Sequence, residues 1–143
     1  MTDFAPGQRW LYRTRPGEDT STALILGREA VPQGEVLHLC LDGLTLLNPL
    51  MDGGVQTSLA HVPVTGDALR ASVETLIEVG VPLPPDTSPI DRWSEEARRG
   101  EAGAFTLPLA EIVGALEQAI ASHDGAALLF QKVNLKERLW HQA

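Results

Sequence analysis

The sequence predicts an α+β protein with an N-terminal antiparallel sheet or small open barrel of four to five strands, followed by three helices packed on it. Residues 1–64 contain runs that alternate apolar and polar residues, separated by turn residues, as half-buried strands do. Residues 65–125 carry apolar residues at helical spacing, bounded by capping residues and glycines. Because strands and helices do not alternate, we expect no parallel nucleotide-binding sheet. We expect a single domain over residues 1–143, with residues 126–143 as a tail.

The first predicted strand is the alternating segment QRWLYRT. A period of two places Trp10 and Tyr12 on one face and Arg9 and Arg13 on the other. We expect the aromatic rings to be buried, and the arginines to lie in water or beside carboxylates of an adjoining strand. The following residues, Arg-Pro-Gly-Glu at 15–18, fit a type II turn, in which proline and glycine supply the two central conformations.

Three further strand segments follow, STALILGRE, EVLHLCL and QTSLAHVPV. In the second of them, alternation separates three leucines from a polar set consisting of His38, Cys40 and Asp42. The pair Asp42-Gly43 is typical of a two-residue hairpin, but a strand that continues past a glycine bulge fits residues 44–48 equally well. Since Pro63 has no N–H group, it should lie on a sheet edge or at the exit of its strand.

Three helices are expected in the second half of the chain. The first is capped by Thr65 or Asp67, carries apolar residues at i, i+4, i+7 and i+8, and ends at Gly80. A linker with four prolines in nine residues separates it from the second helix, which begins at Ser88-Pro89 and ends at Gly100.

The third helix is capped by Thr106, has a full apolar stripe and ends at Gly125. The tail that follows is compatible with a strand or a helix, and Trp140 is its expected anchor. We consider that the tail could join two copies of the chain in a homodimer.

Charge and composition exclude several classes of function. The net charge is −8, and residues 31–89 carry only Arg70 against seven carboxylates, which would repel nucleic acid and favour a basic partner. Cys40 is the one cysteine, so no internal disulfide forms. The sequence shows no signal peptide and no apolar run of the ~20 residues that a membrane span needs. We therefore expect a cytoplasmic protein that does not contact membranes.

Candidate chemistry in the sequence is weak. His38, Cys40 and Asp42, with His61 from another strand, are all zinc-ligand types, but same-face strand positions lie ~6.6 Å apart, too far to converge on one ion. Cys40 could be a nucleophile with His38 as its base, but the neighbouring Asp42 disfavours a thiolate. No phosphate-binding, hydrolase or calcium-loop motif is present. We therefore expect no catalytic, cofactor-binding or metal-binding residue, and whether the protein is an enzyme stays open, with a non-enzyme favoured.

The segments PGQRWLYRTRPGEDTS, VLHLCLDGL and AGAFTLPLAEIVGALEQAI resemble a group of small bacterial proteins of unknown function. The resemblance covers residues 4–121, rests on structural motifs and implies no activity.

The sequence thus favours a small non-catalytic module that binds another protein, such as an acidic inhibitor or immunity-type protein. The alternative is a small-molecule-binding or enzymatic barrel with a pocket between sheet and helices. The candidate interaction or pocket residues are Arg9, Trp10, Tyr12, Arg13 and Trp93.

Overall fold

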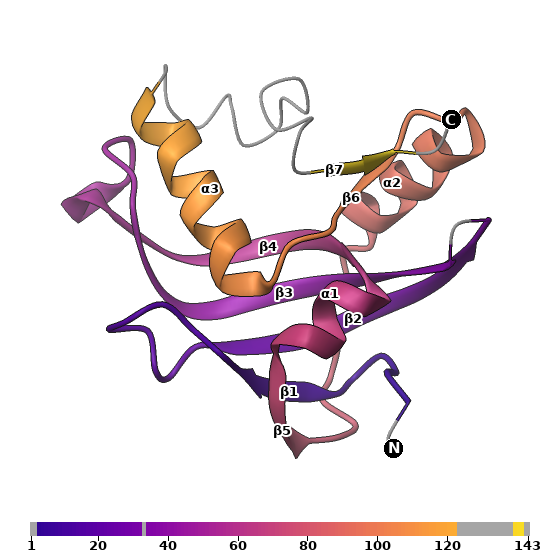
Figure 1. Cartoon of the computed structure of the whole chain (residues 1–143), viewed down its shortest axis with the longest axis horizontal. Helices are drawn as coiled ribbons and strands as arrows, with labels where there is room; N and C mark the ends of the chain where they lie inside the picture. Colours follow the sequence, from indigo (N-terminus) through magenta and orange to yellow (C-terminus); the bar gives the residue numbers. More distant parts are fainter. Residues whose placement is uncertain (1–2, 33, 123–138, 142–143) are drawn as a thin grey trace.

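The computed structural model describes residues 3–32, 34–122 and 139–141, and within them seven strands form one sheet in the order β5-β1-β2-β3-β4-β6-β7 (Figure 1). Neighbouring strands are antiparallel, except for β4 and β6, which are parallel. The strands are β1 (Arg9–Tyr12), β2 (Thr22–Val31), β3 (Gly34–Leu47), β4 (Val55–Thr65), β5 (Val73–Glu78), β6 (Gly103–Phe105) and β7 (Leu139–His141). The helices are α1 (Gly66–Ser72), α2 (Ser88–Arg98) and α3 (Leu109–Ser122), with a short 3-10 turn, η1 (Asp52–Gly54).

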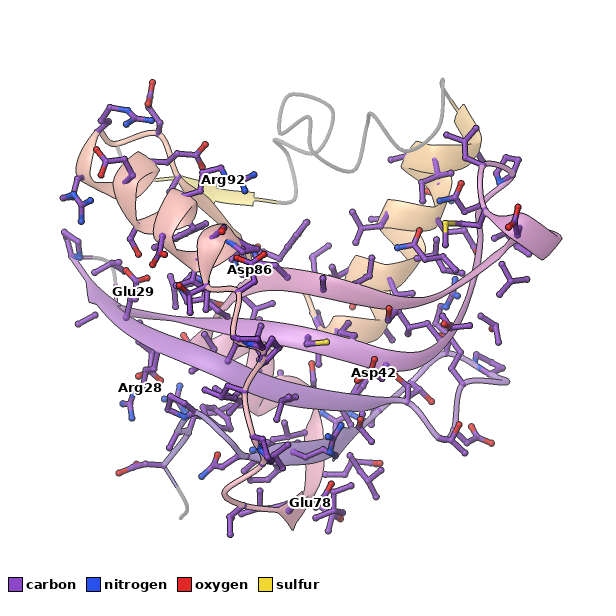
Figure 2. All side chains as sticks on the ribbon, turned by 180° about the vertical axis from the view of Figure 1, so that it is seen from behind. Arg28, Glu29, Asp42, Glu78, Asp86 and Arg92 are labelled. Carbon is purple, nitrogen blue, oxygen red and sulfur yellow. The ribbon has the colours of Figure 1, made fainter. Side chains whose placement is uncertain are left out.

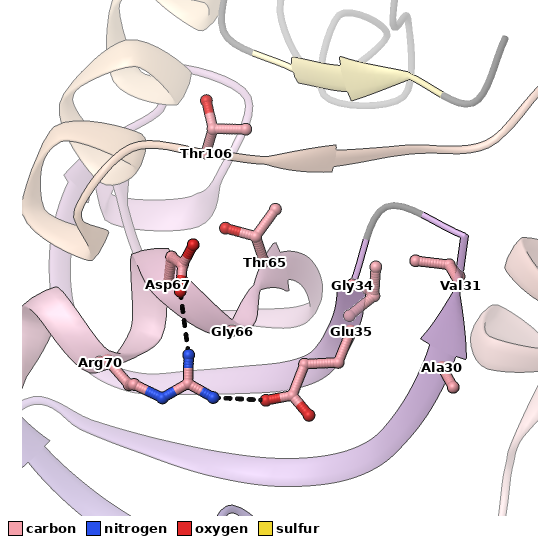
Figure 3. Close-up of a pocket in the computed structure, with 10 residues that line it drawn as sticks. Ala30, Val31, Gly34, Glu35, Thr65, Gly66, Asp67, Arg70 and Thr106 are labelled. Atoms are coloured by element: carbon pink, nitrogen blue, oxygen red, sulfur yellow. Dashed lines mark hydrogen bonds and ion pairs between the residues drawn. The ribbon is translucent and has the colours of Figure 1, made fainter.

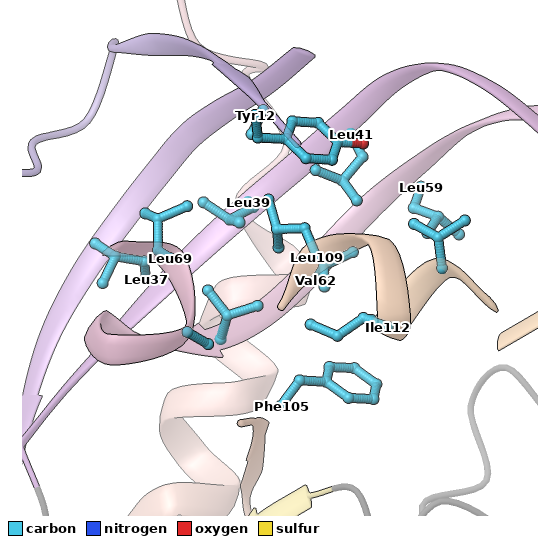
Figure 4. Close-up of a cluster of buried hydrophobic side chains, with 14 of the residues drawn as sticks. Tyr12, Leu37, Leu39, Leu41, Leu59, Val62, Leu69, Phe105, Leu109 and Ile112 are labelled. Carbon is cyan, nitrogen blue, oxygen red and sulfur yellow. The ribbon is translucent and has the colours of Figure 1, made fainter. Parts of the chain in front are cut away.

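The main hydrophobic core lies between one face of the sheet and the helices α1 and α3 (Figure 4). Alternation along β3 directs Leu37, Leu39 and Leu41 into this core, as their spacing predicted, and all three are fully buried. Helix α1 contributes Leu69 to this core, and α3 contributes an apolar stripe. The stripe consists of Leu109, Ile112, Val113, Leu116 and Ile120.

The opposite face of the sheet is covered in part by α2 (Figure 2). Trp93 of α2 packs on Val36, Ala102 and Ala104, and its Nε1 donates a hydrogen bond to the Gly103 carbonyl at 2.8 Å. Residues 79–87 cross the sheet on their way from β5 to α2 and contain no helix or strand, as predicted for the proline-rich linker, except that the last two residues of this linker begin α2. The sheet therefore lies between two hydrophobic clusters.

The predicted order of a sheet followed by helices is wrong, because helices and strands are interspersed. The expected first helix ends at Ser72 rather than at Gly80, and the next residues form the edge strand β5. This strand pairs with β1, for example Trp10 with Leu76, and satisfies backbone groups that β1 would otherwise leave open. The segment VETLIE combines helical spacing with residues that favour strands, so the free edge of β1 decides its conformation.

The structure also shows which of the two alternatives at Gly43 is correct, a two-residue hairpin or a strand that continues past a bulge. β3 continues through this glycine to Leu47, and its pairing with β4 shifts between Asp42 and Leu46, as in a bulge. Gly43 has a φ of +75°, and a Cβ atom there would lie 2.9 Å from the Cα of Ser21. Both the conformation and the close approach of the neighbouring loop require glycine.

Several predicted ends are confirmed, while others differ. Thr65 caps α1 by accepting a hydrogen bond from the Ala68 amide at 3.2 Å. The expected cap of α3 was Thr106, but the Leu109 amide donates instead to the hydroxyl of Ser72 at 2.9 Å. That hydroxyl donates in turn to the Ala68 carbonyl at 2.8 Å, so Ser72 joins the end of α1 to the start of α3.

The type II turn at residues 15–18 is confirmed by a 3.1 Å bond from the Glu18 amide to the Arg15 carbonyl and by a φ of +86° at Gly17. Pro63 is not on a sheet edge, because β4 lies between β3 and β6. It lies near the end of β4, which is the other position that we expected for it. The short strand β6 was not predicted. Of the tail, residues 139–141 pair with β6, whereas Gly125 and residues 126–138 lie outside the described residues.

Candidate functional site

The aromatic residues of β1 are buried, as the alternation predicted. Trp10 and Tyr12 lie in the main core. The indole Nε1 of Trp10 donates to Gln8 Oε1 at 3.0 Å, and the Tyr12 hydroxyl shares a 2.6 Å hydrogen bond with the hydroxyl of Ser21. Burial raises the pKa of Tyr12, so its hydroxyl stays protonated at neutral pH.

The arginines of the same segment do not share a surface with these rings. Arg9 lies on the other side of β1, where it donates to Glu78 Oε1 at 2.6 Å and to Thr22 Oγ1 at 3.2 Å. Glu78 belongs to the adjoining strand β5, as the sequence led us to expect for a paired arginine. Arg13 is exposed. A base-stacking surface needs rings and cations on one face, and β1 separates them.

The three aromatic residues that we expected to wall one pocket do not converge. Trp10 and Tyr12 belong to the core beneath α1 and α3, whereas Trp93 belongs to the cluster beneath α2 on the opposite face. The sheet lies between them, so the five candidate residues from the sequence do not form one site.

A set of polar side chains lies where α2 meets the sheet, and we call Glu29, His38, His61 and Ser94 the histidine cluster. His38 is fully buried. Its Nε2 lies 3.0 Å from Glu29 Oε1 of β2, and its Nδ1 lies 2.8 Å from Nε2 of His61 of β4. Ser94 of α2 donates to the same Glu29 oxygen at 2.5 Å, and the ring of Trp93 packs edge-on against His38 with centroids 5.0 Å apart.

The partners of His38 restrict the hydrogen bonds that its ring can form. Burial lowers the pKa of His38, and the nearby Glu29 carboxylate opposes this effect only in part. A neutral His38 that donates from Nε2 to Glu29 has a lone pair on Nδ1. In that protonation state, Nε2 of His61 is the donor across the 2.8 Å contact. The cluster forms a continuous chain from carboxylate to imidazole to imidazole across three strands.

The histidine cluster has little capacity for a metal ion. Both ring nitrogens of His38 are engaged in hydrogen bonds, so a metal ion would have to displace one of these bonds to coordinate the ring. Within residues 3–32, 34–122 and 139–141, no three His, Cys, Asp or Glu side chains are placed to hold a metal ion. Cys40 lies on the same face of β3, 3.9 Å from Asp42, and burial together with that carboxylate raises the pKa of the thiol. A raised pKa disfavours the thiolate that nucleophilic catalysis requires.

A hollow of about 670 Å³ opens between the β2–β3 hairpin and α1 (Figure 3). Arg70 crosses its floor, with one guanidinium nitrogen 3.0 Å from Asp67 and another 3.0 Å from Glu35. The second oxygen of Glu35 pairs with Arg28 at 2.7 Å. The sequence analysis missed this network, because Glu35 and Arg70 are 35 residues apart and no local pattern relates them.

A smaller hollow of about 250 Å³ adjoins the first and shares Glu35 and Arg70 with it. Trp10 lines this second hollow, and the guanidinium of Arg70 lies 5.7 Å from the ring centroid of Phe4. Arg28, Glu35, Asp67 and Arg70, which line these hollows, are already joined to one another in ion pairs. A charged ligand would have to displace an existing ion pair in order to bind.

Four exposed large apolar side chains lie at the connection between β3 and β4. We call Leu47, Leu50, Met51 and Val55 the hairpin end. Leu47 and Leu50 are 62 % and 64 % exposed, and the other two are also exposed. In Figure 1 this connection, which includes η1, projects beyond the body of the sheet near α3. The sequence analysis missed the hairpin end, because the alternation of apolar and polar residues does not show where a strand extends beyond the helix that covers it.

No protein-family model matches the chain, and no similar protein was found among proteins of curated function or among solved structures. No helix in the described part of the chain is long and apolar enough to cross a membrane.

Proposed function

We propose that the protein is a small binding module that uses the hairpin end to contact a basic partner protein. The observation that carries this proposal is the exposure of four large apolar side chains at a strand connection whose shape is held by hydrogen bonds. Contiguous apolar groups on the surface of a soluble protein are typical of interaction sites.

The backbone of the hairpin end is fixed by Asn48, which is itself buried. Its amide N–H donates to the Gly54 carbonyl at 2.9 Å, and its side-chain Oδ1 accepts from the Leu50 amide at 3.0 Å. Its Nδ2 donates to Gln56 at 2.9 Å. A loop that is ordered before binding loses less conformational entropy when a partner is bound.

The exposure of the hairpin end is local. On the preceding residues of β3, Leu44 and Leu46 are completely buried, whereas Leu47 faces solvent. Transfer of a leucine, methionine or valine side chain from water into a partner is worth about 1.5–3 kcal/mol when burial is complete. Leu50 and Met51 together could therefore supply a central anchor of the kind found in protein interfaces.

The charge of the chain indicates the chemistry of the partner. The net charge is −8, and Asp52 is exposed beside Met51 at the hairpin end. An acidic protein attracts a basic partner at long range, which raises the association rate at low salt.

The test compares interface variants with a matched control. The protein, tagged and expressed in its native host, is used to capture partners as wild type, as Leu50→Ser and as Val79→Ser. Val79 is 71 % exposed but lies away from the hairpin end, so Val79→Ser controls for loss of a surface apolar group. We expect a basic partner with wild type and Val79→Ser, and about 30-fold weaker binding by Leu50→Ser, which corresponds to the roughly 2 kcal/mol of an interface hot spot. Equal binding by all three, or no partner for any, would contradict the proposal.

A second candidate function rests on the hollow at Arg70, whose volume falls in the range of about 300–1,000 Å³ that small-molecule sites occupy. A metabolite in this hollow would raise the thermal midpoint of wild type. Arg70→Gln should abolish that rise while leaving capture through the hairpin end intact. This combination of results would favour the pocket over the binding module.

A further inference from the structure

The hairpin end begins where one edge of β3 is left without a neighbouring strand. Strand β2 pairs with β3 only as far as Asp42, which faces Thr22. The part of β3 that continues to Leu47 pairs with β4 on one side, and within residues 3–32, 34–122 and 139–141 no strand pairs with it on the other. The backbone groups along this free edge therefore need other hydrogen-bond partners.

Two carboxylates take the place of the neighbouring strand. The amides of Thr45 and Leu47 are two residues apart and point to the same side of β3. The Thr45 amide donates to Glu18 Oε2 at 2.7 Å, and the Leu47 amide donates to Glu117 Oε2, also at 2.7 Å. Such short distances are typical of hydrogen bonds to an ionised acceptor. The free edge is thus held by a side chain of the β1–β2 loop and by one of α3.

Arg15 joins these two carboxylates in one network. Its Nε and Nη2 donate to the two oxygens of Glu18 at 2.8 and 2.9 Å, and its Nη1 donates to Glu117 Oε1 at 2.9 Å. Glu117 therefore uses one oxygen for Arg15 and the other for the Leu47 amide. A carboxylate can accept both bonds at once because it has two oxygens, whereas an amide side chain has only one.

The two carboxylates differ in burial. The side chain of Glu18 is 1 % exposed, whereas that of Glu117 is 25 % exposed and Leu47 itself is 62 % exposed. Interactions of exposed charges contribute little to the stability of a whole protein. The bond between Leu47 and Glu117 therefore has a local effect: it fixes the direction of β3 at the residue where the hairpin end begins.

Glu117 and Asn48 hold the hairpin end in different ways. Asn48 closes the connection on itself, through hydrogen bonds with Gly54, Leu50 and Gln56. Glu117 belongs to α3, beside which the connection projects in Figure 1, so its bond ties the hairpin end to a helix of the main core. Asn48 thus sets the shape of the connection, and Glu117 sets how that shape lies relative to the body of the protein.

We propose that Glu117 is a positioning residue for the hairpin end: it holds Leu47, and with it the other exposed apolar side chains, in the orientation in which the partner protein binds them. This inference rests on the binding function proposed above. A surface that is already held in its bound orientation loses less conformational entropy on association. Removal of the Glu117 bond should therefore weaken binding without unfolding the protein.

The first measurement needs no partner. Amide hydrogen exchange of the full chain is followed by NMR in wild type, in Glu117→Ala and in Glu111→Gln, an exposed substitution on the same helix. In Glu117→Ala we expect the Leu47 amide to exchange about tenfold faster, as for the loss of a hydrogen bond to a charged group, while the Thr45 amide keeps its rate. The urea midpoint should stay close to that of wild type. Unchanged exchange at Leu47, or an equal rise at both amides, would overturn the positioning role.

The second measurement is the affinity of the purified variants for the protein that wild type captures from its native host. We expect about fivefold weaker binding by Glu117→Ala, a smaller loss by Glu117→Gln, which keeps one acceptor oxygen, and no loss by Glu111→Gln. If Leu50→Ser loses binding and Glu117→Ala does not, the positioning role is wrong and the binding function stands. If Leu50→Ser keeps binding, or no partner is captured, the binding function fails and the positioning role fails with it.

Discussion

Glu18 is a buried carboxylate that holds the β1–β2 loop against the rest of the fold. Its side chain is 1 % exposed, and both oxygens accept from the guanidinium of Arg15, at 2.8 and 2.9 Å. One oxygen also accepts from the Thr45 amide at 2.7 Å. Arg15 also donates a hydrogen bond to Glu117 of α3 at 2.9 Å. Glu117 accepts a further hydrogen bond from the Leu47 amide. The network joins the loop, β3 and α3.

Substitution of Glu18 by Gln keeps the size of the side chain and removes its charge. The loss of a partner from a fully buried ion pair costs about 3–5 kcal/mol, and a hydrogen bond to a charged group is worth about 1.5–3 kcal/mol. Arg15 is 20 % exposed and keeps its contact with Glu117. The smaller energy, that of a hydrogen bond to a charged group, therefore applies. We expect Glu18→Gln to lower the free energy of unfolding by about 2 kcal/mol at pH 7.

The pH dependence of this loss identifies its cause. Hydrogen bonds from Arg15 lower the pKa of Glu18 against the opposing effect of burial, and the Thr45 amide lowers it further. A carboxyl group with a lowered folded-state pKa stabilises the protein above its unfolded pKa of about 4.3, and this stability is lost as the pH falls through the folded value. Wild type should therefore approach the stability of Glu18→Gln as the solution becomes strongly acidic.

The assay is urea unfolding followed by circular dichroism at pH 7 and pH 3, with Glu111→Gln, an exposed substitution on α3, as the control. At pH 7 the midpoint of Glu18→Gln should fall by about 1 M urea, if the slope is about 2 kcal/mol/M. The gap to wild type should narrow at pH 3, and Glu111→Gln should follow wild type at pH 7. A gap of the same size at both pH values would refute the role assigned to the charge.

Two further predictions follow from the backbone at Gly43 and from the thiol of Cys40. Gly43→Ala should lower the free energy of unfolding by more than Gly53→Ala: both positions have positive φ, which costs about 1 kcal/mol for alanine, but only at Gly43 would the new Cβ collide with the Ser21 backbone. Equal losses in urea unfolding would contradict this reasoning. Alkylation of Cys40 at pH 8 should be slower than that of free cysteine, because burial and Asp42 raise its pKa, and Asp42→Asn should speed it. A rate equal to that of free cysteine would show that the thiol is not protected.

The sequence predicted correctly which faces of the central strands are buried. Trp10 and Tyr12 are inside and Arg9 is outside, because the period of two is a property of the backbone and does not depend on which strand lies next to β1. The turn at residues 15–18 and the cap by Thr65 were predictable for a similar reason. Each depends on hydrogen bonds between residues that are at most three positions apart.

The sequence did not predict where β5 forms, because the local pattern of residues 73–78 suits both a helix and a strand. The strand forms because β1, more than 60 positions earlier, offers an open edge with unpaired backbone groups. Likewise, β3 continues through Gly43 because Asp42 before the bulge and Leu46 after it both pair with residues of β4.

Local sequence thus determined the period of each strand, the polarity of its faces and the acidic charge of the chain. Only the tertiary structure decided which elements cover those faces. The histidine cluster shows the difference: alternation places His38 opposite the core leucines, but its partners come from β2, β4 and α2. Contacts of this kind depend on how distant segments pack, and packing is decided by the free energy of the whole fold, which no single stretch of sequence contains.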